Sequence, residues 1–317
     1  MDLEKAGMIK MAEKNFSIRM EFILLGFSDL PSLQGFLFGM FLIIYTSILI
    51  GNGLIIFITK VTAALQTPMY YFLGNFSFLE ICYTSVTIPR MLSDLWTQKT
   101  NISLLACAVQ LGFLLSLGGS ESFFLAVMAY DRYVAICKPL YYPLIMNHQK
   151  CIQLVTGAWI SGVPVQIAQT CQLFSLSFCN SNKLNHVFCD IPPLLKLACG
   201  DTSLNELSVY GGATIFVTFP SLLILWSYIK IIKTILKLPS AMGRRKAFST
   251  CSSHLIVVGL FYGSGFITYL RPKSSHSPGV DKVLALFYTI VTPLFNPIIY
   301  SLRNKDVIIA IKQLVQK

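Results

Sequence analysis

Two carboxylates, Glu80 and Glu121, lie inside long apolar stretches of the sequence. An ionisable side chain is energetically costly in the hydrocarbon region of a membrane, and such residues are usually functional. Two carboxylates on consecutive membrane spans would share a proton or a cation, because neighbouring like charges oppose each other's ionisation. The pair therefore predicts an ion or proton site at Glu80 and Glu121. The alternative is that each carboxylate faces a water pocket and has no role.

Asp131 and Arg132 form a second pair, at the inner end of another apolar stretch. A buried arginine needs a partner, and the adjacent aspartate can hold it until a better partner arrives. The pair predicts a switch, although an isolated Asp-Arg pair is a weak signal. His254 is the lone histidine of the apolar stretches, and it is more typical of a hydrogen-bonded core histidine than of a ligand. We expect no metal site and no cofactor.

The nine cysteines suggest disulfides on one side of the membrane only. An odd count leaves at least one cysteine free. Four of them lie in or beside a long segment that we place outside the cell, where disulfides form: Cys107, Cys179, Cys189 and Cys199. Four cysteines allow three pairings, and spacing does not choose among them. We expect free thiols, packed as small apolar groups, at Cys82, Cys151 and Cys251.

Seven apolar stretches must position these groups. Hydrophobic residues make up 54% of the chain and charged residues 12%, a composition that excludes an ordinary soluble domain. Each stretch is long enough to cross a bilayer as a helix, which takes about 20 residues. The stretches are Leu33–Thr59, Pro68–Pro89, Leu104–Tyr130, Cys151–Phe174, Leu207–Ile229, Ala247–Leu270 and Val283–Leu302.

The sequence therefore predicts an all-α membrane protein with a seven-transmembrane helix bundle over residues 33–303. Residues 1–32 form an extracellular tail, in which the sequon at Asn15 is a good glycosylation candidate. Residues 304–317 place apolar side chains on one face at helical spacing, so we expect a short amphipathic helix on the inner membrane surface.

The net charge of +11 is distributed as in a membrane protein rather than as in a nucleic-acid-binding protein. With the amino terminus outside, 14 of the 25 Lys and Arg residues lie in cytoplasmic segments, 7 in outer loops and 4 in the amino-terminal tail, a bias that fits the positive-inside rule. We therefore expect membrane lipids around the chain and no nucleic acid partner.

Several motifs, in order along the chain, resemble those of vertebrate odorant receptors. The segment that ends the third span reads MAYDRYVAIC, from Met128 to Cys137. It is accompanied by Gly51-Asn52, by PMYYFL from Pro68, by KAFSTCSSHL from Lys246 and by PLFNPIIYSLRN from Pro293. The resemblance covers residues 21 to 317. The outer loop resembles the class II branch, and residues 75–91 look most like family-six members.

The resemblance implies a rhodopsin-like G protein-coupled receptor with disulfides Cys107–Cys189 and Cys179–Cys199. It also implies roles in coupling and switching for seven residues: Asp131, Arg132, Tyr133, Tyr228, Asn296, Pro297 and Tyr300. Tyr228 would meet Arg132 in the active state. Glu80 departs from the family, since most relatives have Asp there. The sixth span offers no acidic residue to Arg132, so Asp131 is its expected resting partner.

By matching positions, the ligand pocket should lie between the third, fifth and sixth spans. Leu114 stands where amine receptors keep an aspartate, so we expect a neutral, volatile and mostly apolar ligand. Tyr269 would be its main hydrogen-bonding group. The alternative is that these residues only pack the bundle. The predicted lining comprises Leu114, Leu115, Gly118, Gly119, Gly212, Phe216, Phe266 and Tyr269.

These features predict an odorant receptor that activates a stimulatory, olfactory-type G protein and raises cAMP. We expect it in the plasma membrane of the cilia of olfactory neurons, with accessory proteins for trafficking. A non-odorant receptor of the same fold is the closest alternative. A transporter would show inverted repeats and broken helices, which are not evident. An enzyme is not expected, because motifs such as H-E-x-x-H and G-x-S-x-G are missing.

Overall fold

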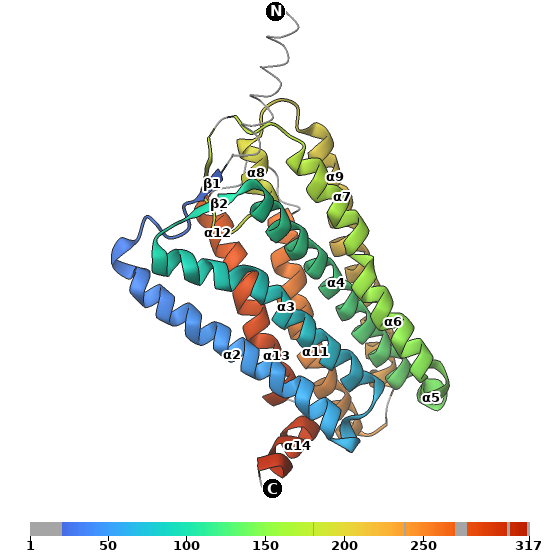
Figure 1. Ribbon diagram of the computed structural model, residues 1–317. Coiled ribbons are helices and arrows are strands. Elements are labelled where there is room, and N and C mark those ends of the chain that lie inside the picture. Colours follow the sequence, from blue (N-terminus) through green and yellow to red (C-terminus); the bar gives the residue numbers. More distant parts are fainter. Residues whose placement is uncertain (1–20, 180, 238, 270–277, 303–304, 316–317) are drawn as a thin grey trace, which may run out of the picture.

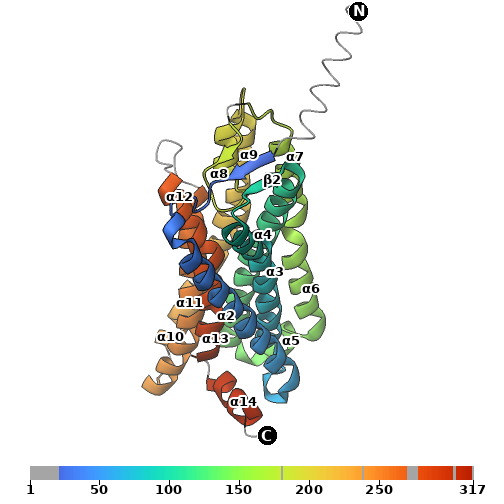
Figure 2. The ribbon, with the colours of Figure 1, turned by 60° about the vertical axis from the view of Figure 1, so that its left-hand side comes forward.

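The computed structural model describes residues 21–179, 181–237, 239–269, 278–302 and 305–315. Its long helices run side by side as an elongated bundle (Figure 1). A small β-sheet lies at one end, which we call the outer end, and a short helix lies beyond the other, inner end (Figures 1 and 2).

The described residues form seven membrane-length segments in the predicted order. They are α2 (Gln34–Val61), α3 (Pro68–Thr97), α4 (Leu104–Cys137), α6 (His148–Ser161) with α7 (Val163–Phe174), α9 (Ser203–Ala213) with the π-helical turn η4 (Thr214–Thr218) and α10 (Phe219–Leu236), α11 (Ala241–Tyr269), and α12 (Pro278–Leu286) with the π-helical turn η6 (Phe287–Val291) and α13 (Thr292–Leu302). Short helices connect or follow them: η1 (Pro31–Leu33), η2 (Ala63–Leu65), η3 (Pro139–Tyr141), α5 (Tyr142–Ile145), α8 (Ile191–Leu197) and α14 (Lys305–Val315).

Six of the seven segments are long and apolar enough to cross a membrane. The exception among the described helices is α3, whose apolar run is interrupted by Glu80, Arg90 and Asp94. It nevertheless packs against both α2 and α4 as an integral part of the bundle. A seven-helix membrane bundle therefore follows from packing as well as from hydropathy.

Local sequence signals set several helix ends. Pro68 opens α3, where its missing N–H is not needed. The hydroxyl of Ser103 accepts a hydrogen bond from the Ala106 N–H at 3.2 Å and caps α4. Asn147 caps α6 in the same way through the Lys150 N–H at 2.9 Å. These caps satisfy N–H groups that a helix start otherwise leaves unpaired.

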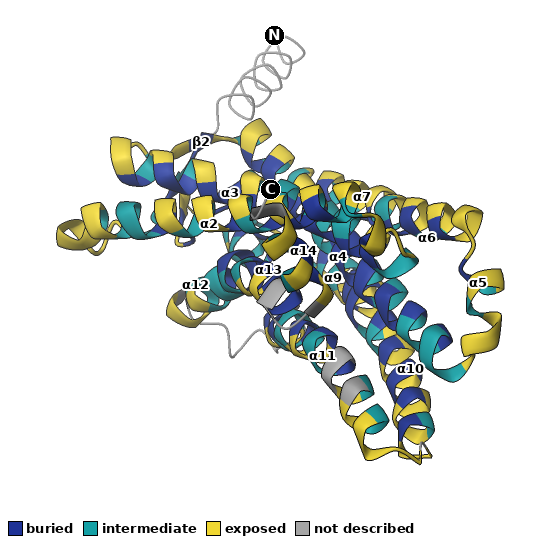
Figure 3. Ribbon diagram, turned by 90° about the horizontal axis from the view of Figure 1, so that it is seen from below, coloured by how far each residue is buried: buried dark blue, intermediate teal, exposed yellow. Residues whose placement is uncertain are grey.

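The outward faces of the helices are apolar. On α2, Phe36 is 70% exposed and Ile43 is 68% exposed, whereas Phe41 and Ile48 turn inward and are buried. Viewed from the inner end, exposed residues lie mainly on the outward faces of the helices and buried residues on the faces toward the bundle (Figure 3). Exposed apolar surface this extensive requires a lipid environment, because soluble proteins do not tolerate it.

Two glycines allow close approach between helices. A Cβ on Gly162, between α6 and α7, would lie 2.5 Å from the carbonyl oxygen of Ser116 on α4. A Cβ on Gly51 of α2 would lie 3.0 Å from the Cβ of Pro297 on α13. A larger side chain would push these helices apart, so Gly51 of the Gly51-Asn52 motif has a packing role.

A three-stranded sheet at the outer end was not anticipated from the sequence. Strand β1 (Glu21–Leu24) lies in the middle, antiparallel to β2 (Asn101–Ser103) and parallel to β3 (Lys183–Leu184). Its Phe22 and Leu24 side chains are buried among residues of the outer loop and α4. Part of the segment predicted as a free tail, residues 1–32, is therefore an ordered strand that joins two outer loops.

Helix α14 occupies the segment for which an amphipathic helix was predicted. Val307 and Ala310 are buried, whereas Ile309 is largely exposed. The phenol of Tyr70 on α3 donates a hydrogen bond to Asp306 at 3.2 Å. These contacts hold α14 against the inner end of the bundle.

Candidate functional site

A cavity of about 100 Å³ lies between the helices, under the outer loop that carries α8. Residues of α3, α4, α7, α9, η4, α11 and η6 form its wall, and Ile191 of α8 contributes from the loop. Its lining is mostly apolar, which suits a small organic ligand. Six of the eight residues predicted to bind ligand lie in this lining: Leu114, Leu115, Gly118, Gly119, Gly212 and Phe216.

The other two predicted pocket residues belong to α11. Phe266 is 37% exposed and does not belong to the described lining. The cavity side of α11 instead presents Phe261, Tyr262, Ser264 and Gly265. The side chain of Tyr269 lies outside the described part of the structure.

Helix α7 supplies two cavity residues that the sequence reasoning missed, Gln166 and Gln169. The Gln169 side-chain N–H donates to the carbonyl of Ser208 on α9, so this amide joins two helices. The available signal was the presence of glutamines in a mostly apolar span, because polar side chains in a membrane usually face the bundle interior.

The outer loop over the cavity is fixed by two disulfides. Cys107 at the outer end of α4 is bonded to Cys189, and Cys179 is bonded to Cys199 within the loop. This is the pairing that the family resemblance implies. The remaining cysteines of the chain, Cys82, Cys137, Cys151, Cys171 and Cys251, are free thiols.

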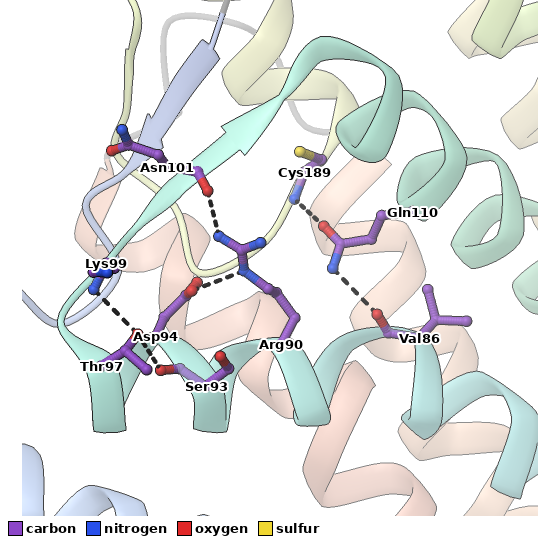
Figure 4. A network of polar contacts seen from close by, with 9 residues as sticks. All are labelled: Val86, Arg90, Ser93, Asp94, Thr97, Lys99, Asn101, Gln110 and Cys189. Atoms are coloured by element: carbon purple, nitrogen blue, oxygen red, sulfur yellow. Dashed lines mark hydrogen bonds and ion pairs between the residues drawn. The ribbon is translucent and has the colours of Figure 1, made fainter.

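Polar contacts reinforce the first disulfide (Figure 4). The Gln110 side chain accepts a hydrogen bond from the Cys189 N–H at 3.1 Å and donates one to the Val86 carbonyl at 3.2 Å. Arg90 binds Asp94 on the same helix at 2.7 Å and donates to the Asn101 carbonyl in β2 at 2.6 Å. The outer loop, the sheet and α3 are therefore linked around the end of α4.

His186 and Asp190 are buried in the outer loop beside the cavity. Asp190 accepts a hydrogen bond from Tyr288 of η6 at 2.8 Å, and Tyr288 itself lines the cavity. Burial lowers the pKa of His186, although the charge of Asp190 opposes this shift. Burial raises the pKa of Asp190, and His186 and the Tyr288 hydrogen bond oppose that shift.

Glu80 and Glu121 meet in the middle of the bundle, from α3 and α4. Both are buried, and the two carboxyl groups are close enough to interact. The amide N–H of Asn296 on α13 donates to Glu80 Oε1. Glu80 Oε2 and Glu121 Oε1 have no hydrogen-bond partner among the described residues. The arrangement joins three helices and leaves acceptor capacity for a proton or a cation.

Asp131 and Arg132 pair at the inner end of α4. Arg132 binds Asp131 Oδ2 through Nε at 3.1 Å and through Nη2. The Tyr142 phenol of α5 donates to Asp131 Oδ1 at 2.8 Å. Burial raises the pKa of Tyr142, and the charge of Asp131 adds to the shift. Asp131 is therefore the partner of Arg132 in this structure, and the inner loop holds that aspartate in place.

The other predicted switch residues make no described hydrogen bond to Arg132. Tyr228 of α10 shares a hydrogen bond with His254 Nδ1 of α11 at 2.8 Å. His254 Nε2 lies 3.2 Å from the Leu125 carbonyl of α4, so this histidine is a hydrogen-bonded core residue. The Tyr300 hydroxyl is buried without a hydrogen-bond partner in the described structure.

The remaining predicted residues are placed as follows. Tyr133 packs against Trp226 with ring centroids 5.1 Å apart. Pro297 lies within α13, where it packs against Gly51. Asn15 falls outside the described residues.

Comparisons with known proteins agree with this architecture. A family model described as olfactory receptor matches residues 41–317. Human olfactory receptor 10AG1 is 60% identical over 94% of this chain and 99% of its own length. Human olfactory receptor 10C1 is 52% identical over 96% and 97% of the two chains. Mouse olfactory receptor 5AP2 is 48% identical over 95% of each. The names of these relatives fall in the 10 and 5 series, whereas residues 75–91 favoured the family-six branch.

Proposed function

Since the chain belongs to the olfactory receptor family of multi-pass, rhodopsin-like receptors, which are not enzymes, we propose that it binds small, mostly apolar odorants and activates a stimulatory, olfactory-type G protein. Activation of that G protein raises cAMP. The ligand site is the cavity beneath the disulfide-linked outer loop, and the coupling site is the inner end of the bundle around Arg132.

The observation that carries this proposal is the apolar cavity itself. Leu114, Phe216 and Val217 contribute aliphatic and aromatic surface, and the outer loop covers them through Ile191. No acidic or basic side chain belongs to the described lining, so a charged amine would be buried there without a counter-ion. A neutral odorant fits these walls, and Tyr269 is proposed as a further hydrogen-bonding group at the ligand.

Activation is a shift between two conformations of the bundle. An odorant activates the receptor only if it binds the active conformation more tightly than the resting one. In the resting state Asp131 holds Arg132, and in the active state Arg132 meets Tyr228 and the G protein. The same change of conformation involves four further residues: Tyr133, Asn296, Pro297 and Tyr300.

Glu80 and Glu121 share a proton or bind a small cation in the resting bundle. The two unpaired carboxylate oxygens support this role, because an unpaired buried acceptor is costly. A Glu121→Gln variant should lose most of the effect of sodium concentration on basal cAMP, since a neutral amide no longer attracts the ion. The control is Asn75→Asp, at a half-buried residue of α3 whose side chain donates to the Tyr71 carbonyl. An equal sodium effect in Glu121→Gln and the wild type would contradict the site.

The charge distribution supports an extracellular amino terminus. Membership of the olfactory receptor family supports residence in the plasma membrane, in the cilia of olfactory neurons. Glycosylation at Asn15 and help from accessory proteins in trafficking fit that route. Treatment of surface receptor with a glycosidase should lower the apparent mass of the wild type and leave the apparent mass of Asn15→Gln unchanged.

The decisive experiment is a cAMP reporter assay in cells that express the full chain, with a panel of neutral odorants and amines. We expect a dose-dependent rise with at least one neutral odorant and none with amines. Arg132→Ala should abolish the rise at equal surface expression, whereas the matched Lys150→Ala, an exposed inner residue at the start of α6, should retain it. Silence of the wild type at proven surface expression would refute odorant signalling for that panel.

A further inference from the structure

Gln166 of α7 carries an unused hydrogen-bond acceptor at the ligand cavity. Its side chain is 5% exposed and lines the cavity. Its Oε1 atom is buried and has no partner in the described part of the structure. A buried amide oxygen without a hydrogen bond destabilises the protein, because it has lost water and gained nothing.

The hydroxyl groups of the cavity wall already have partners, and the Gln169 amide donates to the Ser208 carbonyl. The Tyr262 hydroxyl donates to the Ser122 carbonyl at 2.8 Å, and the Tyr288 hydroxyl donates to Asp190. Ser264 donates to the Phe261 carbonyl at 2.7 Å, and Tyr83 also has a partner. Among the buried side-chain oxygens left without a partner, only that of Gln166 belongs to the described lining.

We propose that Gln166 selects ligands with a hydroxyl group, and that this receptor prefers alcohols or phenols to ethers and hydrocarbons of the same shape. This inference rests on the proposed function, because it concerns the same cavity. An O–H group donates to Gln166 Oε1 and removes the unpaired acceptor. An ether has no proton to donate, so it leaves that oxygen unpaired in an apolar site.

The walls limit the rest of the ligand. The cavity of about 100 Å³ is lined by Leu114, Leu115 and Phe216 around the Gln166 amide. An engineered protein cavity of roughly 150 Å³ accommodates benzene. The ligand is therefore a small molecule with one hydroxyl group on a compact hydrocarbon body.

The test uses matched probes and matched variants. 1-Hexanol, methyl pentyl ether and heptane have the same number of heavy atoms, and phenol and toluene form a ring pair. Gln166→Met keeps the length of the side chain but removes the amide. Gln172→Met makes the same change on α7 at a residue outside the described lining. Gln166→Asn withdraws the amide from the cavity and keeps a polar residue.

Two readouts are needed on the full-length receptor: the half-maximal concentration for cAMP in cells, and the ligand-induced rise in melting temperature of purified protein. In the wild type, hexanol and phenol should act at about two- to tenfold lower concentration than their partners without a hydroxyl group, the effect of one hydrogen bond. Gln166→Met and Gln166→Asn should remove this preference, and Gln172→Met should keep it.

The outcomes separate the two claims. A hydroxyl preference that persists in both Gln166 variants, or its absence from the wild type, overturns the inference. Failure of every probe to stabilise the purified wild type also overturns it. Stabilisation with the expected preference but without any cAMP response supports hydroxyl recognition and refutes the proposed signalling. Without ligand, Gln166→Met should be at least as stable as the wild type, because it removes a buried unpaired oxygen.

Discussion

The two ends of the bundle are held together by different kinds of bond. At the outer end, two disulfides, a three-stranded sheet and a cluster of buried side chains around Phe22 join the loops to α4. At the inner end, the polar contacts include the Asp131–Arg132 pair and the Tyr142, Tyr228–His254 and Tyr70–Asp306 hydrogen bonds. The cysteines nearest to that end, Cys137, Cys151 and Cys251, are free.

The difference separates a part that must keep its shape from a part that must change it. A disulfide stabilises a fold by a few kcal/mol and does not exchange partners during a conformational change. A hydrogen bond contributes about 1 kcal/mol, so a new partner can replace the old one with little net change in free energy. The outer end thus keeps the cavity, while the inner end can be rearranged by the energy of ligand binding.

The largest effect should come from loss of either disulfide at the outer end. Cys107→Ser opens a loop with a sequence separation of 82, and Cys179→Ser opens one with a separation of 20. The chain-entropy relation gives a loss of roughly 4.5 kcal/mol for the first and roughly 3.3 kcal/mol for the second. Surface expression should therefore fall more in Cys107→Ser, as measured by flow cytometry with an epitope tag. The free Cys171→Ser is the control, and an equal loss there would contradict the comparison.

The next effect should appear at Asp131. Asp131→Asn keeps an acceptor for Tyr142 but removes the charge that holds Arg132, at a loss of about 1.5–3 kcal/mol for hydrogen bonds to a charged group. The resting state loses this contact and the active state does not, so ligand-independent cAMP should rise about tenfold or more. Tyr142→Phe, which removes one bond to the same aspartate, should give a smaller rise. Basal activity that falls in both variants would count against a resting-state role.

Tyr228→Phe should have a smaller effect, of opposite sign. The variant loses a neutral hydrogen bond to His254 in this structure and the proposed bond to the charged Arg132 in the active state. Since a bond to a charged group is stronger, the active state should lose about 1 kcal/mol more. Odorant potency should fall about fivefold at unchanged surface expression. A rise in basal activity instead would show that the His254 bond dominates.

The smallest effect should be acid sensitivity of the outer loop. Burial lowers the pKa of His186 below its usual 6.5, with Asp190, Lys282 and Asp281 as its charged neighbours. The folded state therefore favours neutral His186, and this contribution is complete above pH 6.5 and lost as the pH falls toward the lowered pKa. The melting temperature of purified receptor should drop between pH 7 and pH 5, and less so in His186→Gln. The inner-end variants should follow the wild type.

The membrane spans were predictable because continuous apolar runs in lipid must form helices. Their exact ends were not, since α4 continues through Asp131 and Arg132 to Cys137, beyond the apolar run. The π-helical turns η4 and η6 depend on packing between helices, which local sequence does not specify. Strand β1 was missed because its partners lie far away in sequence and four residues carry little periodicity.

The sequence predicted most of the residues that line the cavity, but not all of them. Leu114 and Phe216 lie where matched positions put them. Phe266 does not, because one step along a helix turns a side chain by about 100°, away from the stripe that contains Ser264 and Gly265. Gln166 was missed because the rotation of α7 about its axis follows from the close contact at Gly162, not from hydropathy.

The sheet of the outer end also sets an order of events during biosynthesis. Strand β1 precedes α2 and therefore leaves the ribosome before both of its partners, since β2 lies between α3 and α4 and β3 follows α7. The strand must therefore wait, unpaired, on the far side of the membrane while several spans are inserted. Closure of the sheet is a late maturation step, and a receptor with an unpaired β1 is an immature one that quality control in the secretory pathway can retain.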